Sequence, residues 1–375
     1  MSRRELALYI HIPFCQSKCA YCDFASYPGQ ENVWESYVDA LLKEMREWKD
    51  RLFEYEAATI FLGGGTPSLL PSGMIESILD EVRSCVSLSP DAEISMEANP
   101  GTLTMDKLKA CRKAGFNRLS IGAQSFEDRL LKSLGRIHTS RQIYESVDMA
   151  RAAGFDNLNL DLMYALPGQE PADWRHTLDS AIMLKPDHVS AYSLIVEPGT
   201  PMAGRVARGE AILPDDDQTN GMQRMAVEKL AEAGYVRYEI SNFAQPGYAC
   251  RHNLTYWLRG DYLGLGCAAH SMMAGWRFAN PAGLHAYLSG ERRIDVQQLS
   301  RTDAMEETLM LSTRTCRGLD RAAWYQQFGE DFLTGRERQV RRLQSAGLIE
   351  LSDDFLRLTL RGMEVQNAVV LELMR

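Results

Sequence analysis

The chain has 375 residues, of which 45% are hydrophobic and 24% are charged, and its formal net charge at pH 7 is −9. These proportions are those of globular proteins, and they exclude a disordered, collagen-like or coiled-coil chain. Its apolar runs fall short of the roughly 18 residues that cross a membrane, and its acidic charge argues against general binding of nucleic acid. We therefore expect a cytoplasmic protein with no transmembrane segment and no nucleic-acid partner.

Strand-like and helix-like segments alternate from residue 6 to residue 194. Short apolar or β-branched runs separated by segments of helical period are typical of a parallel α/β fold. The runs predict six strands, near Ala7–Ile12, Thr59–Leu62, Glu93–Glu97, Arg118–Gly122, Asn157–Met163 and His188–Leu194. We expect these strands to form a partial (β/α)6 TIM-like barrel over residues 1–197.

Polar side chains occupy alternate positions of five of the six predicted strands. They are Tyr9, His11, Ser95, Glu97, Ser120, Gln124, Asn159, Asp161, His188, Ser190 and Tyr192. Alternate positions share one face of a strand, and a closed barrel normally fills its interior with bulky aliphatic side chains. The polar face therefore predicts an open lumen that holds a polar ligand, unless these positions face outward against the helices.

The pattern changes after Glu197. A helix over Asp216–Ala233, a strand over Tyr235–Ile240 and an aromatic, glycine-rich stretch that follows predict a small α+β region over residues 198–300. That region contains none of the regular alternation that precedes it.

A third region, residues 301–375, is helical and charged. It ends in an expected hairpin, Leu348–Leu351 with Leu356–Leu360, and a last helix, so it resembles a winged-helix module. The basic residues of one of its helices could contact DNA, but in an acidic chain a basic helix face is more often simply solvated. They are Arg336, Arg338, Arg341 and Arg342.

Three cysteines form a CxxxCxxC motif directly after the first predicted strand: Cys15, Cys19 and Cys22. In a reducing compartment such a cluster indicates a metal site and not a disulfide. Three thiolates can hold three corners of a [4Fe–4S] cluster and leave the fourth iron open to another ligand. Structural zinc is the alternative, but zinc needs four ligands, and the nearest fourth candidate is His11.

Seven candidate cofactor contacts follow the predicted strands at their carboxyl ends, where barrel active sites are found. They are Gly64, Gly65 and Thr66 after the second strand, Glu97 at the third, Gln124 and Arg136 at and beyond the fourth, and Asp161 at the fifth. Glycines in a turn let backbone N–H groups approach a ligand closely. Each carboxylate alone could be an ordinary rim charge, but their joint placement predicts a ligand site.

With Tyr21 before its last cysteine, the CxxxCxxC motif resembles the signature of the radical S-adenosylmethionine (SAM) superfamily. The resemblance implies that the open iron binds the amino and carboxylate groups of SAM, while the protein positions the cofactor and excludes water. Residue by residue, the chain also resembles the coproporphyrinogen III dehydrogenase branch at two sets of SAM contacts. They are Tyr9, Gly64 and Glu97 for the cluster-bound SAM, and Gly65, Thr66, Gln124, Arg136 and Asp161 for a second SAM.

Further phrases extend the resemblance over most of the chain: YIHIPFC, FLGGGTPS, DLMYALPGQ, YEISNFA and RHNLTYW. The dehydrogenase type has a fourth cysteine where this chain has Phe24, and an extension of which this chain has only Met1 to Glu5. Phe at that position, a short N-terminus and an HNxxYW motif are instead similar to heme chaperones of the HemW type. The resemblance implies a protein that binds heme and delivers it to heme-accepting apoproteins of respiration.

The HNxxYW motif makes His252 the candidate heme contact. An imidazole is a good iron ligand, and Tyr256 and Trp257 can pack against a porphyrin face. The nearby alternatives as ligands are Cys250, Cys267 and His270. The other interpretation of His252 is a hydrogen-bonded packing residue between the barrel and the second region.

Two enzyme functions are the alternatives to heme delivery. The first is oxygen-independent coproporphyrinogen III dehydrogenase, against which Phe24 argues. The second is a radical SAM C-methyltransferase, which would form S-adenosylhomocysteine. The sequence contains no amphipathic anchor, so any peripheral membrane association would go through the recipient protein or exposed patches.

Overall fold

The structure is a computed structural model that describes residues 3–374. The barrel strands are β1 (Arg4–Ile12), β4 (Tyr55–Gly64), β5 (Ser87–Ala98), β6 (Arg118–Gln124), β7 (Leu158–Tyr164) and β8 (His188–Ser193). The helices that connect them are α1 (Trp34–Trp48), α2 (Ser72–Cys85), α3 (Met105–Ala114), α4 (Asp128–Ser133), α5 (Ser140–Ala152) and α6 (Pro171–Met183). Each barrel strand pairs in parallel with the next. The predicted partial (β/α)6 barrel is therefore confirmed.

The sheet continues beyond both ends of the barrel and does not close on itself. Beside β8 lie β10 (Asn242–Ala244) and then β9 (Val236–Arg237), both paired antiparallel. Beside β1 lies the parallel strand β11 (Tyr262–Leu265), followed by β12 (His270–Met273), β13 (Trp276–Ala279) and β14 (Ile294–Gln298), which are antiparallel. Within residues 3–374 these strands and the barrel form a twelve-stranded sheet, so neither edge of the partial barrel is left unpaired.

Local sequence determines where the barrel helices begin and end. The Thr104 hydroxyl accepts a hydrogen bond from the Lys107 N–H at the start of α3, which satisfies a free helix donor. The helix ends at Gly115, whose φ of 113° lies in the left-handed region that favours glycine. The chain then enters β6 through Phe116, which is fully buried. This cap leads directly into β6, all of whose residues are buried.

The predicted strand over Tyr235–Ile240 is mostly wrong, because only Val236–Arg237 is a strand. The Arg237 guanidinium donates hydrogen bonds to the carbonyls of Glu239 and Ile240. The Glu239 carboxylate in turn accepts from the Ser241 N–H. These side-chain contacts stabilise a turn in a segment whose residues have strand propensity.

The second region adds helices to the sheet and shares its core. They are α7 (Pro201–Ala207), α8 (Asp216–Glu232), α9 (Arg251–Trp257) and α10 (Leu284–Leu288). The predicted helix over Asp216–Ala233 is confirmed by α8. Side chains of the second region, such as Phe243 and Tyr287, belong to the same hydrophobic cluster as the barrel. The helices of the described chain are all too short or too polar to cross a membrane.

The C-terminal region packs around a hydrophobic cluster of its own, which includes Trp324, Phe332 and Leu356. Its elements are α11 (Arg301–Ser312), β15 (Leu319–Asp320), α12 (Arg321–Phe328), α13 (Glu337–Ser345), β16 (Ile349–Leu351), β17 (Phe355–Leu358), α14 (Leu360–Glu364) and α15 (Gln366–Met374). The predicted hairpin is present as β16 and β17. Division of the chain into domains at residues 197 and 300 stays a prediction.

Candidate metal centre

The cysteine motif lies in the loop that leaves the barrel at the carboxyl end of β1. The short strands β2 (Phe14–Cys15) and β3 (Tyr27–Pro28) pair in parallel and close this loop at its base. Its middle is attached to the barrel by the Ala20 N–H, which donates to the Leu134 carbonyl over 2.9 Å. Cys15, Cys19 and Cys22 are free thiols and all half-buried. The loop therefore presents three sulfur atoms at one end of the barrel.

A cavity of about 370 Å³ lies between this loop and the carboxyl ends of the strands. Its size falls in the range of cofactor sites. The predicted site residues in its wall are Cys15, Cys19, Cys22, Gly64, Gly65, Thr66, Glu97, Gln124, Arg136 and Asp161. The fold thus brings together the three cysteines and both sets of predicted SAM contacts, except Tyr9.

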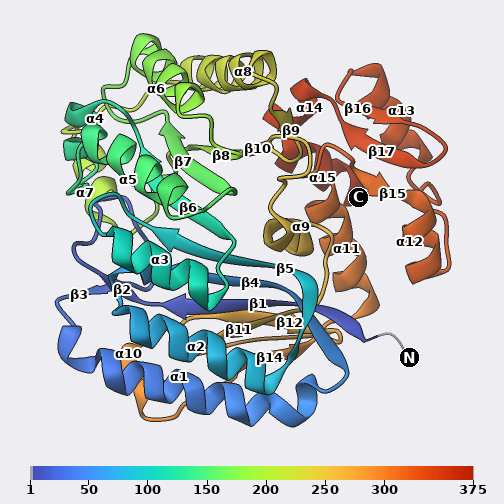
Figure 1. Cartoon of the computed structure of the whole chain (residues 1–375). Helices are drawn as coiled ribbons and strands as arrows, with labels where there is room; N and C mark the ends of the chain where they lie inside the picture. The colour runs from blue at the N-terminus through green and yellow to red at the C-terminus, as the bar shows by residue number, and fades with distance from the viewer. Residues whose placement is uncertain (1–2, 375) are drawn as a thin grey trace.

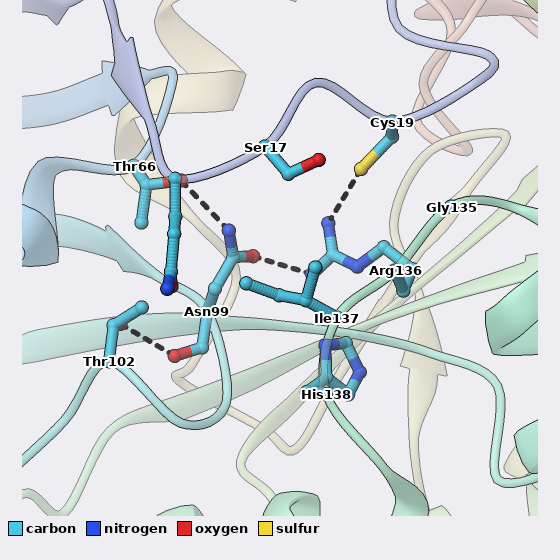
Figure 2. Close-up of a pocket in the computed structure, with 10 residues that line it drawn as sticks. Ser17, Cys19, Thr66, Asn99, Thr102, Gly135, Arg136, Ile137 and His138 are labelled. Carbon is cyan, nitrogen blue, oxygen red and sulfur yellow. Dashed lines mark hydrogen bonds between the residues drawn. The ribbon is translucent and has the colours of Figure 1, made fainter. Parts of the chain in front are cut away.

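Asn99 is a residue of this site that the sequence analysis missed. Figure 2 shows it between Thr66 and Arg136, where its side-chain N–H donates to the Thr66 hydroxyl over 2.8 Å. Arg136 donates to the Asn99 side-chain carbonyl over 2.5 Å and points a second N–H at Cys19 Sγ, 3.6 Å away (Figure 2). The Thr66 hydroxyl lies 3.6 Å from Cys15 Sγ. The sequence feature that could have identified Asn99 is its amide side chain two residues beyond Glu97, at the same end of the strand.

These neighbours affect the charge on the sulfur atoms. Burial raises the pKa of the Cys15 thiol, while the Thr66 hydroxyl and the Arg136 guanidinium act in the opposite direction. Burial also raises the pKa of Cys22, against the opposing charge of Lys18. Hydrogen-bond donors and cations beside the sulfur atoms favour thiolates, which are the form that binds iron.

The glycine turn allows the close approach of three chain segments. A Cβ at Gly64, whose φ is 108°, would lie 2.3 Å from the His11 ring, and a Cβ at Gly65 would lie 2.6 Å from the Phe14 carbonyl oxygen. The Gly64 N–H donates to Glu97 Oε2 over 3.0 Å, and the N–H groups of Gly65 and Thr66 donate to backbone carbonyls. All three donors therefore have protein acceptors here, and none of them points free at a ligand as the sequence had suggested.

The lumen below the cavity is polar, as predicted. Asp161 accepts hydrogen bonds from Ser120 (2.9 Å) and Asn159 (2.8 Å). His188 donates through Nδ1 to the Asn159 carbonyl (2.6 Å), so its Nε2 accepts from the Tyr238 hydroxyl (2.8 Å). Burial lowers the pKa of His188 well below its usual value, so the ring is neutral. A chain of hydrogen bonds thus connects the cavity wall to the second region.

Glu97 carries the perturbed carboxyl group of the site. Burial and the neighbouring Asp161 carboxylate raise the pKa of Glu97 to about 7, against the opposing effects of the Gly64 N–H and Arg118. Two carboxyl groups in one buried space repel each other when both are charged. A cationic ligand in the cavity would relieve that repulsion.

Tyr9 and His11 lie beneath the cavity and form a pair. His11 Nε2 donates to the Ala25 carbonyl over 2.9 Å, so Nδ1 is the acceptor for the Tyr9 hydroxyl at 3.0 Å. Both ring nitrogens of His11 are therefore occupied, and His11 holds the cysteine loop instead of completing a zinc site. Tyr9 itself does not line the cavity among the described residues.

His252 lies deeper, on α9, and is almost fully buried. Its Nδ1 is 2.8 Å from the Thr59 hydroxyl, its Nε2 is 2.8 Å from the Tyr256 hydroxyl, and its ring stacks on Phe61 at 5.1 Å. Burial and the nearby Arg118 charge lower the pKa of His252 to about 3. The neutral ring is packed between barrel and second region, and iron ligation by His252 would first have to break one of these hydrogen bonds.

The alternative ligands of the second region differ in accessibility. Cys250 is fully buried and its Sγ lies 3.4 Å from Glu93, while the buried Cys267 Sγ lies 2.9 Å from the Ala282 carbonyl. His270 is exposed at the start of β12. The two cysteines are therefore engaged in close packing.

The donor set fits an iron–sulfur cluster better than a single metal ion. Within residues 3–374, His, Cys, Asp and Glu side chains form no group close enough to hold one ion. A zinc site needs four ligands around one centre, whereas a cubane binds each thiolate through a different iron. Three cysteines spread around one cavity, with room for a ligand at the fourth corner, satisfy the second requirement.

A partial parallel barrel with such a loop after its first strand defines a radical SAM protein. In agreement, the model of the radical SAM superfamily matches residues 9–181, and that of the HemN C-terminal domain matches residues 299–365. The solved structure of coproporphyrinogen III oxidase (HemN) from Escherichia coli is similar over the whole chain and 91% of its own length, with a TM-score of 0.86 and 25% identity.

Curated relatives identify the family more closely. The chain is 36% identical to the heme chaperone HemW of Bacillus subtilis, over 96% of this chain and 97% of the relative. It is 45% identical to that of Escherichia coli, over 71% and 69%, and 36% identical to that of Mycobacterium tuberculosis, over 99% and 95%. The chain belongs to the HemW family of radical SAM proteins. Its membership confirms the predicted [4Fe–4S] cluster and SAM as cofactors.

Proposed function

We propose that this protein binds heme and delivers it to acceptor apoproteins. The observation that carries the proposal is the similarity, over 96% of the chain, to relatives named heme chaperones. Phe24 supports it, because this side chain lines the cavity and is 62% exposed at the position where the dehydrogenase type has a cysteine. We further propose that delivery takes place in the cytoplasm and that respiratory apoproteins are the acceptors.

Cys15, Cys19 and Cys22 would hold the [4Fe–4S] cluster, which supplies a redox-active centre and an open iron for SAM. Gly64 and Glu97 would contact SAM at this iron, with Tyr9 beneath them. Gly65, Thr66, Gln124, Arg136 and Asp161 would form the rest of the SAM site. Arg136 and Thr66 would stabilise the thiolates, because both lie within 3.6 Å of a sulfur atom.

His252 is the proposed heme ligand, reached when α9 shifts. The test is an anaerobic hemin titration of the reconstituted protein beside its His252→Ala variant, followed by the Soret band and by the heme retained after gel filtration. We expect stoichiometric retained heme that weakens in the variant. No retained heme in either protein would contradict heme delivery, and equal retention would discard His252 alone.

The cluster is tested separately with Cys19→Ser. We expect this variant to lose the broad absorbance that a reconstituted cluster shows at about 400 nm, because one of three protein ligands is gone. Cys111→Ser is the matched control, since Cys111 is buried in α3 far along the chain from the motif. Unchanged iron content in Cys19→Ser would contradict the ligand assignment.

The second candidate function is coproporphyrinogen III dehydrogenation. The whole-chain structural similarity to HemN, with a TM-score of 0.86, favours it over other radical SAM reactions. Anaerobic incubation with coproporphyrinogen III, SAM and a reductant tests this candidate, and vinyl products would replace heme delivery as the proposed function. Formation of S-adenosylhomocysteine in the same assay would indicate a methyltransferase.

A further inference from the structure

An aromatic groove lies on the outer side of the sheet, away from the cysteine motif. It is an open cavity of about 350 Å³ between the end of α1 and the strands β12 to β14. The groove is lined by Trp48, Arg51, Tyr55, Met273, Ala274, Trp276, Phe278, Arg293 and Val296. In Figure 1, α1 and the edge strand β14 lie at the lower side of the molecule, and α9 lies above them, beyond the barrel strands.

The floor of the groove is apolar. Trp48 and Phe278 stack with their ring centroids 5.5 Å apart and their planes at 13°. Met273 completes this floor and, like the two rings, is buried. One wall is exposed: Trp276 has 42% of its surface accessible and Val296 has 56%. An exposed apolar surface beside stacked aromatic rings favours a flat hydrophobic ligand.

Two arginines, Arg51 and Arg293, stand at the groove, and they also line a small cavity with Glu44 and Glu47. The guanidinium groups of Arg51 and Arg293 lie 5.3 Å and 5.6 Å from the centroid of Trp48. The neighbouring Arg292 is different, because it faces Glu44 at 3.9 Å. Among the described residues, Arg51 and Arg293 form no ion pair, although the chain as a whole carries a net charge of −9. Unpaired guanidinium groups are strong donors for carboxylates.

The backbone at Arg293 is also unusual. Its φ is 52°, in the left-handed region that residues other than glycine rarely adopt, and its N–H donates to the Asn280 side chain over 3.3 Å. A non-glycine residue in this conformation costs free energy, and such residues cluster at ligand sites. The conformation directs the chain so that Arg293 stands beside Trp48.

We propose that this groove binds a planar aromatic carboxylate, with its ring against the exposed Trp276 and the apolar floor and its carboxylates on Arg51 and Arg293. The choice of ligand rests on the proposed function: among planar aromatic carboxylates, heme is the one that the groove accepts. Heme joins a flat apolar macrocycle to two propionates. The groove is open to solvent, whereas His252 is buried, so the groove is where heme first docks. Recognition here uses the ring and the carboxylates and needs no iron ligand.

The test is a titration of the full-length protein with hemin and, separately, with metal-free protoporphyrin, followed by quenching of tryptophan fluorescence and by absorbance. Both should bind the wild type. In a His252→Ala background, which lacks the proposed iron ligand, their dissociation constants should agree within about threefold, because the groove contacts only the ring and the carboxylates. Arg51→Gln with Arg293→Gln should weaken both by about tenfold, because two charge-assisted contacts are lost. Trp276→Ala should weaken both by a similar factor, because one wall of the groove is removed.

Matched controls remove the same groups elsewhere. Arg338→Gln with Arg341→Gln takes the same charge from the exposed face of α13, and Tyr325→Ala removes an aromatic side chain that is 59% exposed. Neither should change the affinity for either porphyrin.

The outcomes separate the groove from the proposed function. Wild-type protein that binds neither porphyrin would contradict both. Hemin bound equally by wild type and groove variants would overturn the groove and leave heme delivery standing. Hemin bound without protoporphyrin would show that iron ligation governs binding, and would also overturn the groove. Groove variants that change only the oligomeric state in gel filtration would assign the surface to a second copy of the chain.

Discussion

Glu97 lies at the end of β5 with its carboxyl group between the glycine turn and Asp161. Burial beside a second carboxylate raises the pKa of Glu97 to about 7. The folded state therefore binds this proton more tightly than the unfolded state, whose carboxyl has a pKa of 4.5. In the protein without its cofactors, stability is lost as the pH rises from about 4.5 through about 7, because the carboxylate must then be charged while buried.

Glu97→Gln should remove this pH dependence. The amide carbonyl can still accept the Gly64 N–H, but the side chain no longer titrates. We expect the variant and the wild type to have equal free energies of unfolding at pH 4. At pH 8 the free energy of unfolding of the variant should be higher by about 3 kcal/mol. The measurement is denaturant unfolding of the cofactor-free protein at both pH values. An equal difference at pH 4 and pH 8 would contradict a raised pKa.

At the scale of elements, α9 is the helix that joins the barrel to the rest of the molecule. Its N-terminal end is capped by Glu93 of β5, whose carboxylate accepts from the N–H groups of Arg251 (3.0 Å) and His252 (3.3 Å). Figure 1 shows α9 between the barrel strands and α11. A carboxylate at a helix N-terminus accepts hydrogen bonds from the free N–H groups and interacts favourably with the helix dipole. The position of His252 thus depends on a residue of the barrel.

Glu93→Ala should release α9. The variant leaves two helix N–H groups without an acceptor and removes one of the carboxylates near the buried Arg118, so we expect a loss of about 3 kcal/mol in the free energy of unfolding. Glu93→Gln keeps one acceptor and should lose less. Hydrogen exchange of the α9 amides should accelerate in the alanine variant more than that of α3 amides. Unchanged exchange in α9 would mean that Glu93 does not hold the helix.

At the scale of the whole molecule, the C-terminal module is held to the sheet by a shared carboxylate. Glu307 of α11 pairs with Arg259 (3.2 Å), which follows α9, and with Arg277 of β13 (2.7 Å). The side chains of Glu307 and Arg259 are 13% and 11% exposed. Arg314 stacks on Trp257 at 4.5 Å next to this contact. Partly buried ion pairs of this kind resist screening by salt.

Glu307→Ala should loosen the module. We expect a loss of about 2 kcal/mol, since two half-buried guanidinium groups lose their partner, and faster proteolytic cleavage between residues 290 and 300. Glu330→Ala is the matched control, because Glu330 faces Arg301 at 3.7 Å in an exposed pair of the kind that contributes little. Equal sensitivity of the two variants to protease would contradict this docking contact.

The partial barrel could be predicted from the sequence because its signals are local. The period of each strand, the helix end at Gly115 and the spacing of Cys15, Cys19 and Cys22 all lie within a few residues of the structure they determine. The cavity wall followed from the same logic, since parallel strands place their carboxyl ends at one edge. Asn99 was missed because its contacts with Thr66 and Arg136 join three separate loops.

Only the tertiary structure decided how the second region packs and pairs with the barrel. Its strands β9 to β14 extend both edges of the barrel sheet, and edge pairing depends on contacts between residues far apart in the chain. The burial of His252 depends in the same way on side chains from distant segments, such as Thr59. The sequence by itself determined the barrel, the cysteine loop and the family resemblance, because these depend on local pattern. The aromatic groove and the environment of His252 depend on packing, which no short pattern encodes.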